Sequence, residues 1–381
     1  MRSAGRTNLA WLESLSPWPE EFGVGQMRAL LRRLGNPERR FKSIHVVGSN
    51  GKTTTTRFAE GLLLAEAMET GAYTSPHVVS WSERIRVGGE EVDLEAALAR
   101  VRREAEAMGA TQFEVLTAAA FAEFAAAGVQ VAVVEAGLGG RHDATNVLDA
   151  TTVVLTNVAL EHTDVLGHTR EEIAAEKLAV VRPEAGALVV LGEPEWAEAA
   201  RASGASGVTV VAGSSRVLAH AAVESCLGRT VDPAPLEGVV VPGRLERVGE
   251  SPLEVWDGAH NLAGLGYMLT RVPSADWVIV VSILSDKDAR GMLAALSALG
   301  GTLIATSSSN ARTLPAEELA SLGRSYFGRI EAISEPVEAL ARGRELAGED
   351  GALLVTGSLY LLADLASVRG SCLPWQASAS G

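Results

Sequence analysis

The segment from Gly48 to Thr53, Gly-Ser-Asn-Gly-Lys-Thr, has the residue types that bind phosphate. Backbone N–H groups of a glycine turn at the start of a helix attract phosphate oxygens, a lysine reaches the terminal phosphates, and a threonine hydroxyl binds Mg2+. An apolar run precedes this segment and a helix-like pattern follows it, as in a phosphate loop. Only Ser49 and Asn50 separate Gly48 from Gly51, however, whereas the usual pattern has four residues between its glycines. From these residues alone, a nucleotide site and an ordinary strand–helix turn are both open.

Three further residues have side chains suited to catalysis or metal binding. Glu135 ends an apolar run, and a carboxylate at the carboxyl end of a buried parallel strand lies at the edge where open α/β sheets bind ligands. His162 follows another apolar run and is flanked by acidic residues, so it suits a hard cation or a phosphate. Lys177 lies among acidic and alanine residues, where a solvated lysine is the ordinary case. A surface strand end at Glu135, and a surface or packing role for His162, are also open.

Regular elements must position these residues, and the apolar runs indicate which elements those are. Short runs rich in Val, Ile and Leu alternate with longer Ala-, Leu- and Glu-rich segments, as in a parallel sheet covered by helices on both faces. We therefore predict an α/β fold, with an N-terminal P-loop parallel-sheet ATPase domain and a smaller C-terminal Rossmann-like α/β domain. Prolines and glycines before residue 245 indicate a junction there, giving domains 1–245 and 246–381. The predicted strands cover residues 43–47, 131–137, 151–158 and 187–192 in the first domain and 277–284, 302–308 and 352–362 in the second.

Length and composition limit the class of protein. The chain has 381 residues, enough for two domains, and its 47% hydrophobic and 21% charged residues are typical of a globular protein. The net charge of -14 argues against nucleic-acid binding, which needs a basic face. Cys226 and Cys372 are the only cysteines and lie far apart in sequence, which predicts neither a disulfide framework nor a cysteine-rich zinc site. Without a membrane-length apolar stretch or a signal-peptide core, we expect a cytoplasmic protein with no membrane partner. We also expect a monomer.

Eight motifs occur in an order that resembles the Mur-type ATP-dependent amide ligases. Among these ligases the chain is most similar to folylpolyglutamate synthase and its bifunctional dihydrofolate synthase form. The resemblance extends from residue 22 to residue 365 and so covers most of the chain. In order, the motifs are HVVGSNGKT, YTSPHVVSWSERIRV, TQFEVLTAAAFAEFA, VVEAGLGGRHDATN, TNVALEHTDVLGHTREEIAAEK, PGRLE, DGAHN and SDKD.

The resemblance implies that the phosphate loop serves to activate a carboxylate. In the family, ATP phosphorylates the carboxylate of a pterin-linked acceptor, a folate or dihydropteroate, to an acyl phosphate. The amine of L-glutamate then attacks, a tetrahedral intermediate collapses and phosphate leaves. This reaction needs metal ions that neutralise the converging anions and a geometry that aligns donor and acceptor. Two domains that close around the substrates would keep water from the acyl phosphate.

The resemblance also assigns roles to single residues. Lys52, His162 and Lys177 are expected to be catalytic, with Lys52 on the γ-phosphoryl group and Lys177 carbamylated by CO2 into a carboxylate-like metal ligand. The residues expected to bind ATP are Gly48, Ser49, Asn50, Gly51, Lys52, Thr53, Arg244, Asp257 and His260. Those expected to hold two Mg2+ ions are Thr53, Glu135, His162 and Lys177. Those expected on the substrate side are Ser75, Pro76, His77 and Arg312, with Glu114 and Thr117 on a nearby helix.

The chain departs from the family pattern at two places. Its loop reads Gly-Lys-Thr-Thr where folylpolyglutamate synthases usually have Gly-Lys-Gly-Ser, a change that still supplies a hydroxyl to Mg2+. Between residues 196 and 244 the segment is shorter than in the family, and His220 lies about where an adenine-binding asparagine is expected. Adenine recognition and the identity of the acceptor are therefore open. A surface role for Arg312, and a capping or packing role for Glu114 and Thr117, are open as well.

Two other functions compete with a folate:glutamate ligase. One is a Mur-type ligase for a different acceptor, such as a UDP-sugar peptide or a specialised pterin. The motif YTSPHVVSWSERIRV disfavours it, because this motif resembles the folate group. The other is a non-catalytic nucleotide-binding regulator. Such a protein would lack the metal and carbamate positions, yet Glu135, His162 and Lys177 are present, so an enzyme is favoured.

Overall fold

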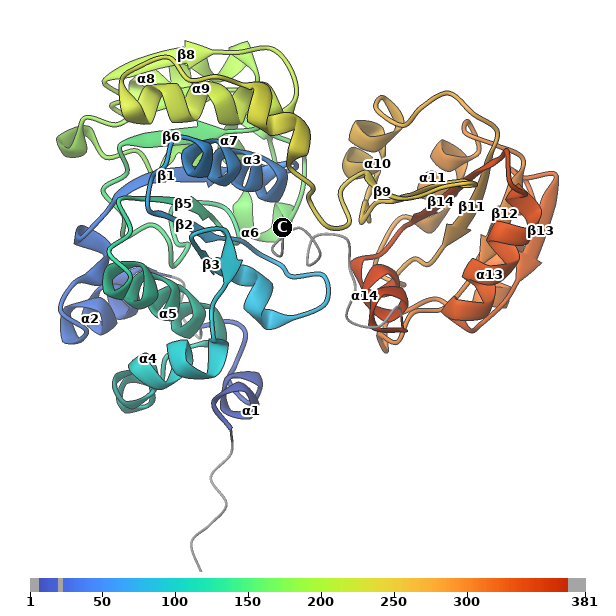
Figure 1. Ribbon diagram of the computed structural model, residues 1–381, viewed down its shortest axis with the longest axis horizontal. Coiled ribbons are helices and arrows are strands. Elements are labelled where there is room, and N and C mark those ends of the chain that lie inside the picture. Colours follow the sequence, from blue (N-terminus) through green and yellow to red (C-terminus); the bar gives the residue numbers. More distant parts are fainter. Residues whose placement is uncertain (1–6, 20–22, 369–381) are drawn as a thin grey trace, which may run out of the picture. The chain divides into compact units, whose positions relative to one another are not determined.

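The computed structural model describes residues 7–19 and 23–368. The chain forms two compact units, Met1–Val239 and Val240–Gly381 (Figure 1). Arg244, which the predicted junction assigns to the first domain, groups with the second unit. Among the helices of the described residues, none is long and apolar enough to cross a membrane.

The first unit is built on an eight-stranded sheet with the strand order β4-β3-β2-β5-β1-β6-β7-β8. The six strands from β2 to β8 in this order are parallel, whereas β3 and β4 form an antiparallel edge. Val46 of β1 pairs with Glu135 of β5 and with Val154 of β6, so these three strands end at the same edge of the sheet. The strands are β1 (Lys42–Val47), β2 (Thr70–Tyr73), β3 (Ile85–Val87), β4 (Glu90–Glu91), β5 (Val131–Glu135), β6 (Thr152–Leu155), β7 (Leu188–Leu191) and β8 (Gly207–Val210).

Helices cover both faces of this sheet (Figure 1). Glu135 points to the face of α3, because its carboxylate bonds the Thr53 hydroxyl in the first turn of that helix. Val134 points to the opposite face, since side chains alternate along a strand, and it belongs to the core under α5. The helices of this unit are α1 (Asn8–Glu13), α2 (Gly25–Arg33), α3 (Lys52–Ala65), α4 (Leu94–Met108), α5 (Gln112–Ala126), α6 (Thr163–Leu166), α7 (Arg170–Leu178), α8 (Ala197–Ala202) and α9 (Ser215–Leu227), with short 3-10 turns η1 (Pro37–Arg39), η2 (Trp81–Arg84), η3 (Pro183–Ala185), η4 (Pro194–Trp196) and η5 (Ala234–Gly238).

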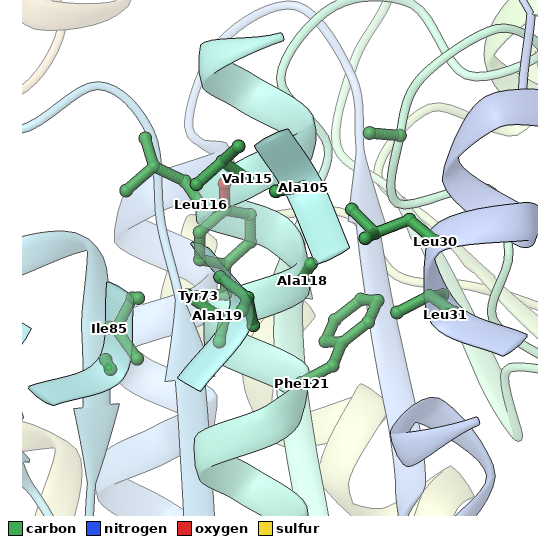
Figure 2. Close-up of a cluster of buried hydrophobic side chains, with 14 of the residues drawn as sticks. Leu30, Leu31, Tyr73, Ile85, Ala105, Val115, Leu116, Ala118, Ala119 and Phe121 are labelled. Carbon is green, nitrogen blue, oxygen red and sulfur yellow. The ribbon is translucent and has the colours of Figure 1, made fainter. Parts of the chain in front are cut away.

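A large apolar core surrounds α5 and fixes it against the sheet. Leu116 and Phe121 of α5, Tyr73 of β2 and Leu30 and Leu31 of α2 are buried together in this core (Figure 2). A helix that is apolar on nearly all sides must lie between other elements, which is the place of α5. Because Tyr73 ends β2, this packing also fixes where the following loop begins.

Glu114 and Thr117 have structural partners at this core. The backbone N–H of Thr111 donates to Glu114 Oε2 at 2.9 Å, which completes a capping box at the N-terminus of α5. Thr117 donates its hydroxyl to the Phe113 carbonyl at 2.8 Å and lies 3.2 Å from Tyr73 Oη. These contacts favour the capping and packing roles.

The second unit is a six-stranded sheet with the strand order β13-β12-β11-β14-β10-β9. All of its strands are parallel except β9, which pairs antiparallel with β10. Its elements are β9 (Glu246–Glu250), β10 (Leu253–Trp256), α10 (Leu262–Leu269), β11 (Trp277–Val281), α11 (Ala289–Leu296), β12 (Thr302–Ala305), α12 (Ala316–Gly323), β13 (Arg329–Ala332), α13 (Pro336–Ala347), β14 (Ala352–Thr356) and α14 (Leu359–Val368). The predicted α/β class is thus confirmed for both units.

The predicted strand 352–362 is too long. Strand β14 ends at Thr356, and the helix α14 begins at Leu359. Between them Gly357 has φ 95°, and a Cβ at this position would lie 2.5 Å from the Ser282 carbonyl oxygen. Glycine therefore allows the turn here. The apolar run continues across the turn into α14, so apolar composition could not mark the boundary.

Candidate active site

The segment Gly48 to Thr53 forms a tight loop between β1 and α3. Gly48 has φ 141°, and a Cβ there would overlap the Thr156 hydroxyl, so a larger residue does not fit. Gly51, with φ 79°, is the N-cap of α3 and offers no side-chain cap, and the first turn of α3 has no acidic residue. The Lys52 amine donates to the carbonyls of Gly48 and Ser49 at 3.0 and 3.1 Å. Backbone N–H groups, the positive helix end and a nearby ammonium group make this loop suited to a phosphate.

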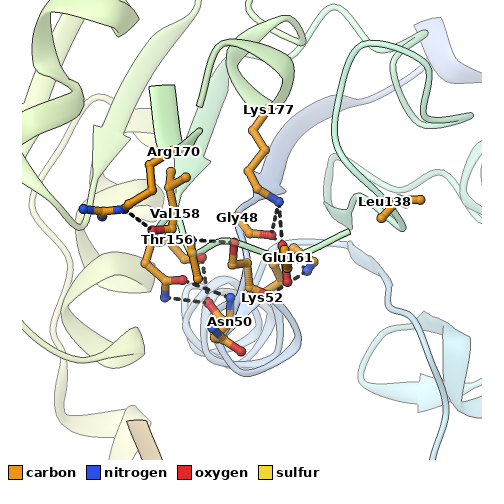
Figure 3. A network of polar contacts seen from close by, with 12 residues as sticks. Gly48, Asn50, Lys52, Leu138, Thr156, Val158, Glu161, Arg170 and Lys177 are labelled. Atoms are coloured by element: carbon orange, nitrogen blue, oxygen red, sulfur yellow. Dashed lines mark hydrogen bonds and ion pairs between the residues drawn. The ribbon is translucent and has the colours of Figure 1, made fainter. Parts of the chain in front are cut away.

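Thr156 and Asn157 complete the phosphate loop; they begin one of the eight motifs, but the resemblance assigned them no role. The Asn50 N–H donates to Asn157 Oδ1 and Asn157 Nδ2 donates to the Asn50 carbonyl, both at 3.0 Å. The Thr156 hydroxyl donates to the same carbonyl at 2.7 Å (Figure 3). The sequence feature that could have identified them is their position directly after β6. This strand neighbours β1, and β1 leads into the phosphate loop.

Glu135 is buried at the same edge and holds two loops together. Its carboxylate accepts from the Thr53 hydroxyl at 2.9 and 3.0 Å and from the backbone N–H of Ser75 at 3.0 Å. With an exposed fraction of 1%, it does not end its strand at the surface. A hydroxyl and a carboxylate side by side are the oxygen donors that Mg2+ prefers, so this pair fits the ion.

His162 is exposed and starts the short helix α6 in a left-handed conformation, with φ 46°. Among residues 7–19 and 23–368, no three His, Cys, Asp or Glu side chains gather as a complete metal site. Mg2+ commonly completes its coordination with substrate phosphates and water, so a pair of protein ligands is compatible with its binding. The role of His162 at a second ion stays a prediction.

Lys177 is buried, contrary to the ordinary expectation for a lysine among acidic residues. Its exposed fraction is 1%, and its amine donates to the Gly48 carbonyl and to Glu161 Oε1, both at 3.0 Å (Figure 3). Burial, and then the charge of Lys52, lower the pKa of this amine to about 8. A Cβ at Gly140 would lie 2.5 Å from the Lys177 carbonyl oxygen, so the loop after β5 packs directly on the backbone of α7. The structure thus brings Lys177 to the phosphate loop.

The loop after β2 places an aromatic group beside the Glu135 contact. Ser75 and Pro76 are joined by a cis peptide bond, and His77 follows. His77 Nδ1 accepts from Arg84 Nε at 3.0 Å, and its ring centroid lies 4.6 Å from that of Trp81. Burial, and then the charge of Arg84, lower the pKa of His77 to about 4, so the ring is neutral at pH 7. A neutral histidine on an indole is suited to contact a flat aromatic ligand.

In the second unit, Arg244, Asp257 and His260 gather around one turn. Asp257 is buried and accepts from the backbone N–H groups of Leu245 and Ala259 at 2.9 and 2.8 Å. Burial raises the pKa of its carboxyl, and Arg244 opposes that rise. His260 Nδ1 donates to the Gly258 carbonyl at 2.9 Å. Asp257 therefore braces this turn, and the expected ATP contacts of the three residues stay predictions.

Two other predicted positions have local partners. Arg312 is exposed and lies 3.6 Å from Asp286 of the SDKD motif. His220 Nε2 donates to the Val231 carbonyl at 2.7 Å and lies 3.6 Å from Glu224. His220 therefore fixes the chain that follows α9, and its relation to adenine stays open.

A buried histidine connects β1 to the loop that follows β5. His45 Nε2 lies 2.8 Å from the Thr145 hydroxyl, which in turn donates to Asp143. Asp143 also accepts from the backbone N–H groups of Leu138 and Thr145, at 2.9 and 3.0 Å. These bonds fix the loop that packs on α7.

We expect His45 to make the protein sensitive to mild acid. Burial, and then the charge of Arg182, lower the pKa of His45 to about 3 from 6.5. As pH falls below 6.5, His45 binds a proton in the unfolded chain but stays neutral in the folded chain. The free energy of unfolding therefore decreases as pH falls. Between pH 7 and 5 this one group should lower the free energy of unfolding by about 2 kcal/mol. Urea unfolding of the wild type and of His45→Gln at both pH values checks this, and an equal loss in both proteins would contradict it.

Comparisons with known proteins cover both units. The Mur ligase middle domain matches residues 46–221, and the Mur ligase glutamate ligase domain matches residues 243–359. The chain is 33% identical to the dihydrofolate synthase/folylpolyglutamate synthase of Mycobacterium tuberculosis, over 82% of this chain and 80% of the relative. The structure resembles E. coli FolC in complex with DHPP and ADP, with a TM-score of 0.85, 28% identity, and coverage of 97% of this chain and 99% of that one.

A second solved structure extends this similarity to an enzyme with metal and glutamate. It is a bifunctional folylpolyglutamate synthase/dihydrofolate synthase with Mn, AMPPNP and L-glutamate bound, with a TM-score of 0.83 and 28% identity. The similarity covers 95% of this chain and 97% of that one. The resemblance inferred from the motifs is thereby confirmed. The chain belongs to the Mur ligase family, in its group of dihydrofolate and folylpolyglutamate synthases.

Proposed function

We propose that the chain is an ATP-dependent ligase that joins L-glutamate to the carboxylate of a folate or dihydropteroate through an acyl phosphate. The observation that carries this proposal is the convergence of the Lys177 amine and the Lys52 amine on the Gly48 carbonyl, next to the Thr53 hydroxyl and the buried Glu135 carboxylate. Phosphate-binding groups beside oxygen ligands for a hard cation suit phosphoryl transfer between two anions. The relatives of this chain have the same reaction class.

Each residue of the phosphate loop has a separate task in this scheme. The backbone N–H groups from Gly48 to Thr53, including those of Ser49, Asn50 and Gly51, bind the β- and γ-phosphates at the N-terminus of α3. Lys52 exchanges its two carbonyl partners for oxygens of the γ-phosphoryl group and stabilises the charge that spreads over them. The acceptor carboxylate attacks the γ-phosphorus, ADP leaves, and the glutamate amine then displaces phosphate from the acyl phosphate.

Two metal ions would neutralise the charge of these anions. Thr53 and Glu135 would hold one Mg2+, and His162 and a carbamylated Lys177 would hold the second ion. Support for the first pair comes from the oxygens that already lie within hydrogen-bond distance of each other. Support for the second comes from a buried lysine with a lowered pKa, because only a neutral amine reacts with CO2.

The remaining roles concern the substrates. Ser75, Pro76 and His77 form the pterin side in this proposal, supported by the neutral His77 ring on Trp81. Arg312 meets the carboxylate of a substrate, in exchange for its weak surface contact with Asp286. Arg244, Asp257 and His260 contribute to ATP binding from the second unit. We propose a monomer as the working unit.

Phosphate release tests the proposal. Purified protein with ATP, Mg2+ and L-glutamate is assayed with dihydropteroate, with tetrahydrofolate and with no acceptor. We expect release that needs both glutamate and a pterin, and the better pterin identifies the preferred acceptor. No phosphate release with either pterin would refute the proposed substrate class. Equal phosphate release with and without L-glutamate would refute the ligase reaction.

A further inference from the structure

The Asn157 side chain forms a two-bond pair with the backbone of the phosphate loop. It accepts from the Asn50 N–H and donates to the Asn50 carbonyl. Both backbone groups of one residue are bonded in the same way between two paired β-strands. The Ser49 N–H donates to the Asn157 carbonyl at 2.9 Å, which adds a third bond in register. The amide of Asn157 thus extends a strand-like ladder from β6 onto the loop.

The short spacing of the glycines explains why the loop needs this ladder. A longer phosphate loop has additional residues with which to hold its own curve, whereas here Ser49 and Asn50 alone join the two glycines. Both polar backbone groups of Asn50 are satisfied from Thr156 and Asn157 rather than from within the loop. Such groups seek partners when they are shielded from water, so removing the ladder frees the loop to rearrange.

Asn157 is itself anchored away from the loop. The next residue, Val158, donates its N–H to Glu193 Oε2 at 3.0 Å. Its carbonyl accepts from Arg170 Nε at 2.9 Å (Figure 3). Trp196 Nε1 donates to the same Glu193 oxygen at 2.7 Å, and the Arg170 guanidinium lies 5.1 Å from the Trp196 ring centroid. This anchor does not involve the phosphate loop, so it holds Asn157 in place whether or not a nucleotide is bound.

We propose that Asn157 is a positioning residue that shapes the phosphate loop for the nucleotide before it binds. The inference rests on the proposed function, because it takes the loop as the site of ATP. Pre-organisation of the loop lowers the entropy cost of binding. Its loss should weaken nucleotide binding while leaving the sites for the other substrates unchanged.

Asn157→Leu tests the proposal by removing both amide bonds at similar volume. We expect roughly 30-fold weaker binding of fluorescent mant-ADP without metal, because the freed residues Ser49 and Asn50 must then be ordered as the nucleotide binds. The KM for ATP should rise by about the same factor, while the KM for L-glutamate and the melting temperature without nucleotide stay close to the wild type. This split separates a positioning role from a general loss of structure, which would shift all of these quantities together.

Two further variants keep the test decisive if Asn157→Leu does not fold. Thr156→Val removes one bond to the Asn50 carbonyl and should weaken mant-ADP binding by roughly fivefold. Asn157→Asp keeps the acceptor for the Asn50 N–H but adds a negative charge near the phosphates, and it should weaken binding more than Asn157→Leu. Asn36→Asp, at a partly exposed turn of the same unit, is the matched control for the added charge.

The outcomes separate this inference from the proposed function. Unchanged mant-ADP affinity in the folded Asn157 and Thr156 variants would overturn the positioning role. A fall in melting temperature with equal rises in both KM values would also overturn it. A wild-type protein that binds no adenine nucleotide would instead overturn the proposed function. If the wild type binds mant-ADP, the affinities of the variants decide the role of Asn157.

Discussion

Lys52→Ala is expected to abolish turnover. Lys52 begins α3, and its amine lies 3.0 Å from the Gly48 carbonyl and 3.1 Å from that of Ser49, where only the side chain must move to meet a γ-phosphate. Alanine removes the ammonium group from the place where negative charge develops, and the backbone N–H groups remain. Loss of one such group at a preorganised site lowers the rate by roughly 10³-fold.

Phosphate release in the presence of ATP, glutamate and the preferred pterin measures this effect. Lys42→Ala is the matched control, because Lys42 is exposed at the start of β1, the strand that leads into the loop. The control should retain wild-type turnover. Turnover of Lys52→Ala within a few-fold of the control would mean that the loop does not hold the reacting phosphate.

Lys177→Ala should also be inactive, but short carboxylic acids such as acetate should partly restore it. Lys177 is the second amine near the Gly48 carbonyl, and two ammonium groups there repel each other and any metal ion. Addition of CO2 to the neutral amine would replace this positive charge by a carboxylate-like group. The pKa of about 8 gives Lys177 a larger neutral fraction at pH 7 to 8 than an ordinary lysine has.

Rescue identifies the chemical role of the missing group. Acetate can occupy the space left by the side chain and supply the oxygens of the carbamate. It should not restore Lys52→Ala, which serves as the control because that variant lacks a cation rather than an anion. Full activity of Lys177→Ala without acetate, or equal rescue of both variants, would count against the carbamate.

The positions of the phosphate loop and of Glu135 could be predicted because each directly follows or ends an apolar strand. A glycine turn between an apolar strand and a helix identifies the loop, and parallel strands bring their carboxyl ends to one edge, which identifies Glu135. The burial of Lys177 was not predictable in this way. A helix such as α7 shows charged residues on several sides, and only the fold decides which of them faces the loop.

Asn157 could not be found from spacing, because its role depends on strand order. Residues 50 and 157 become neighbours since β6 pairs directly with β1, although β2 and β5 come between them in sequence. Several strands were missed for a related reason. β2 is a short Thr-Gly-Ala-Tyr segment and β13 is a partly exposed edge strand, so neither forms the continuous apolar run that marks a buried strand.

The contact of Gly140 with α7 makes the position of the Lys177 backbone insensitive to the salt concentration and pH of the solvent. The spacing between the loop and the Lys177 backbone is set by the hard contact of uncharged atoms, which neither ionic strength nor pH alters. The bond between Lys177 and Glu161, in contrast, depends on charge. Loss of the Glu161 charge should therefore loosen the amine at the end of the Lys177 side chain while the helix that carries it keeps its place. Gly140→Ala would do the reverse, shifting the helix while leaving every polar group of the site in the chain.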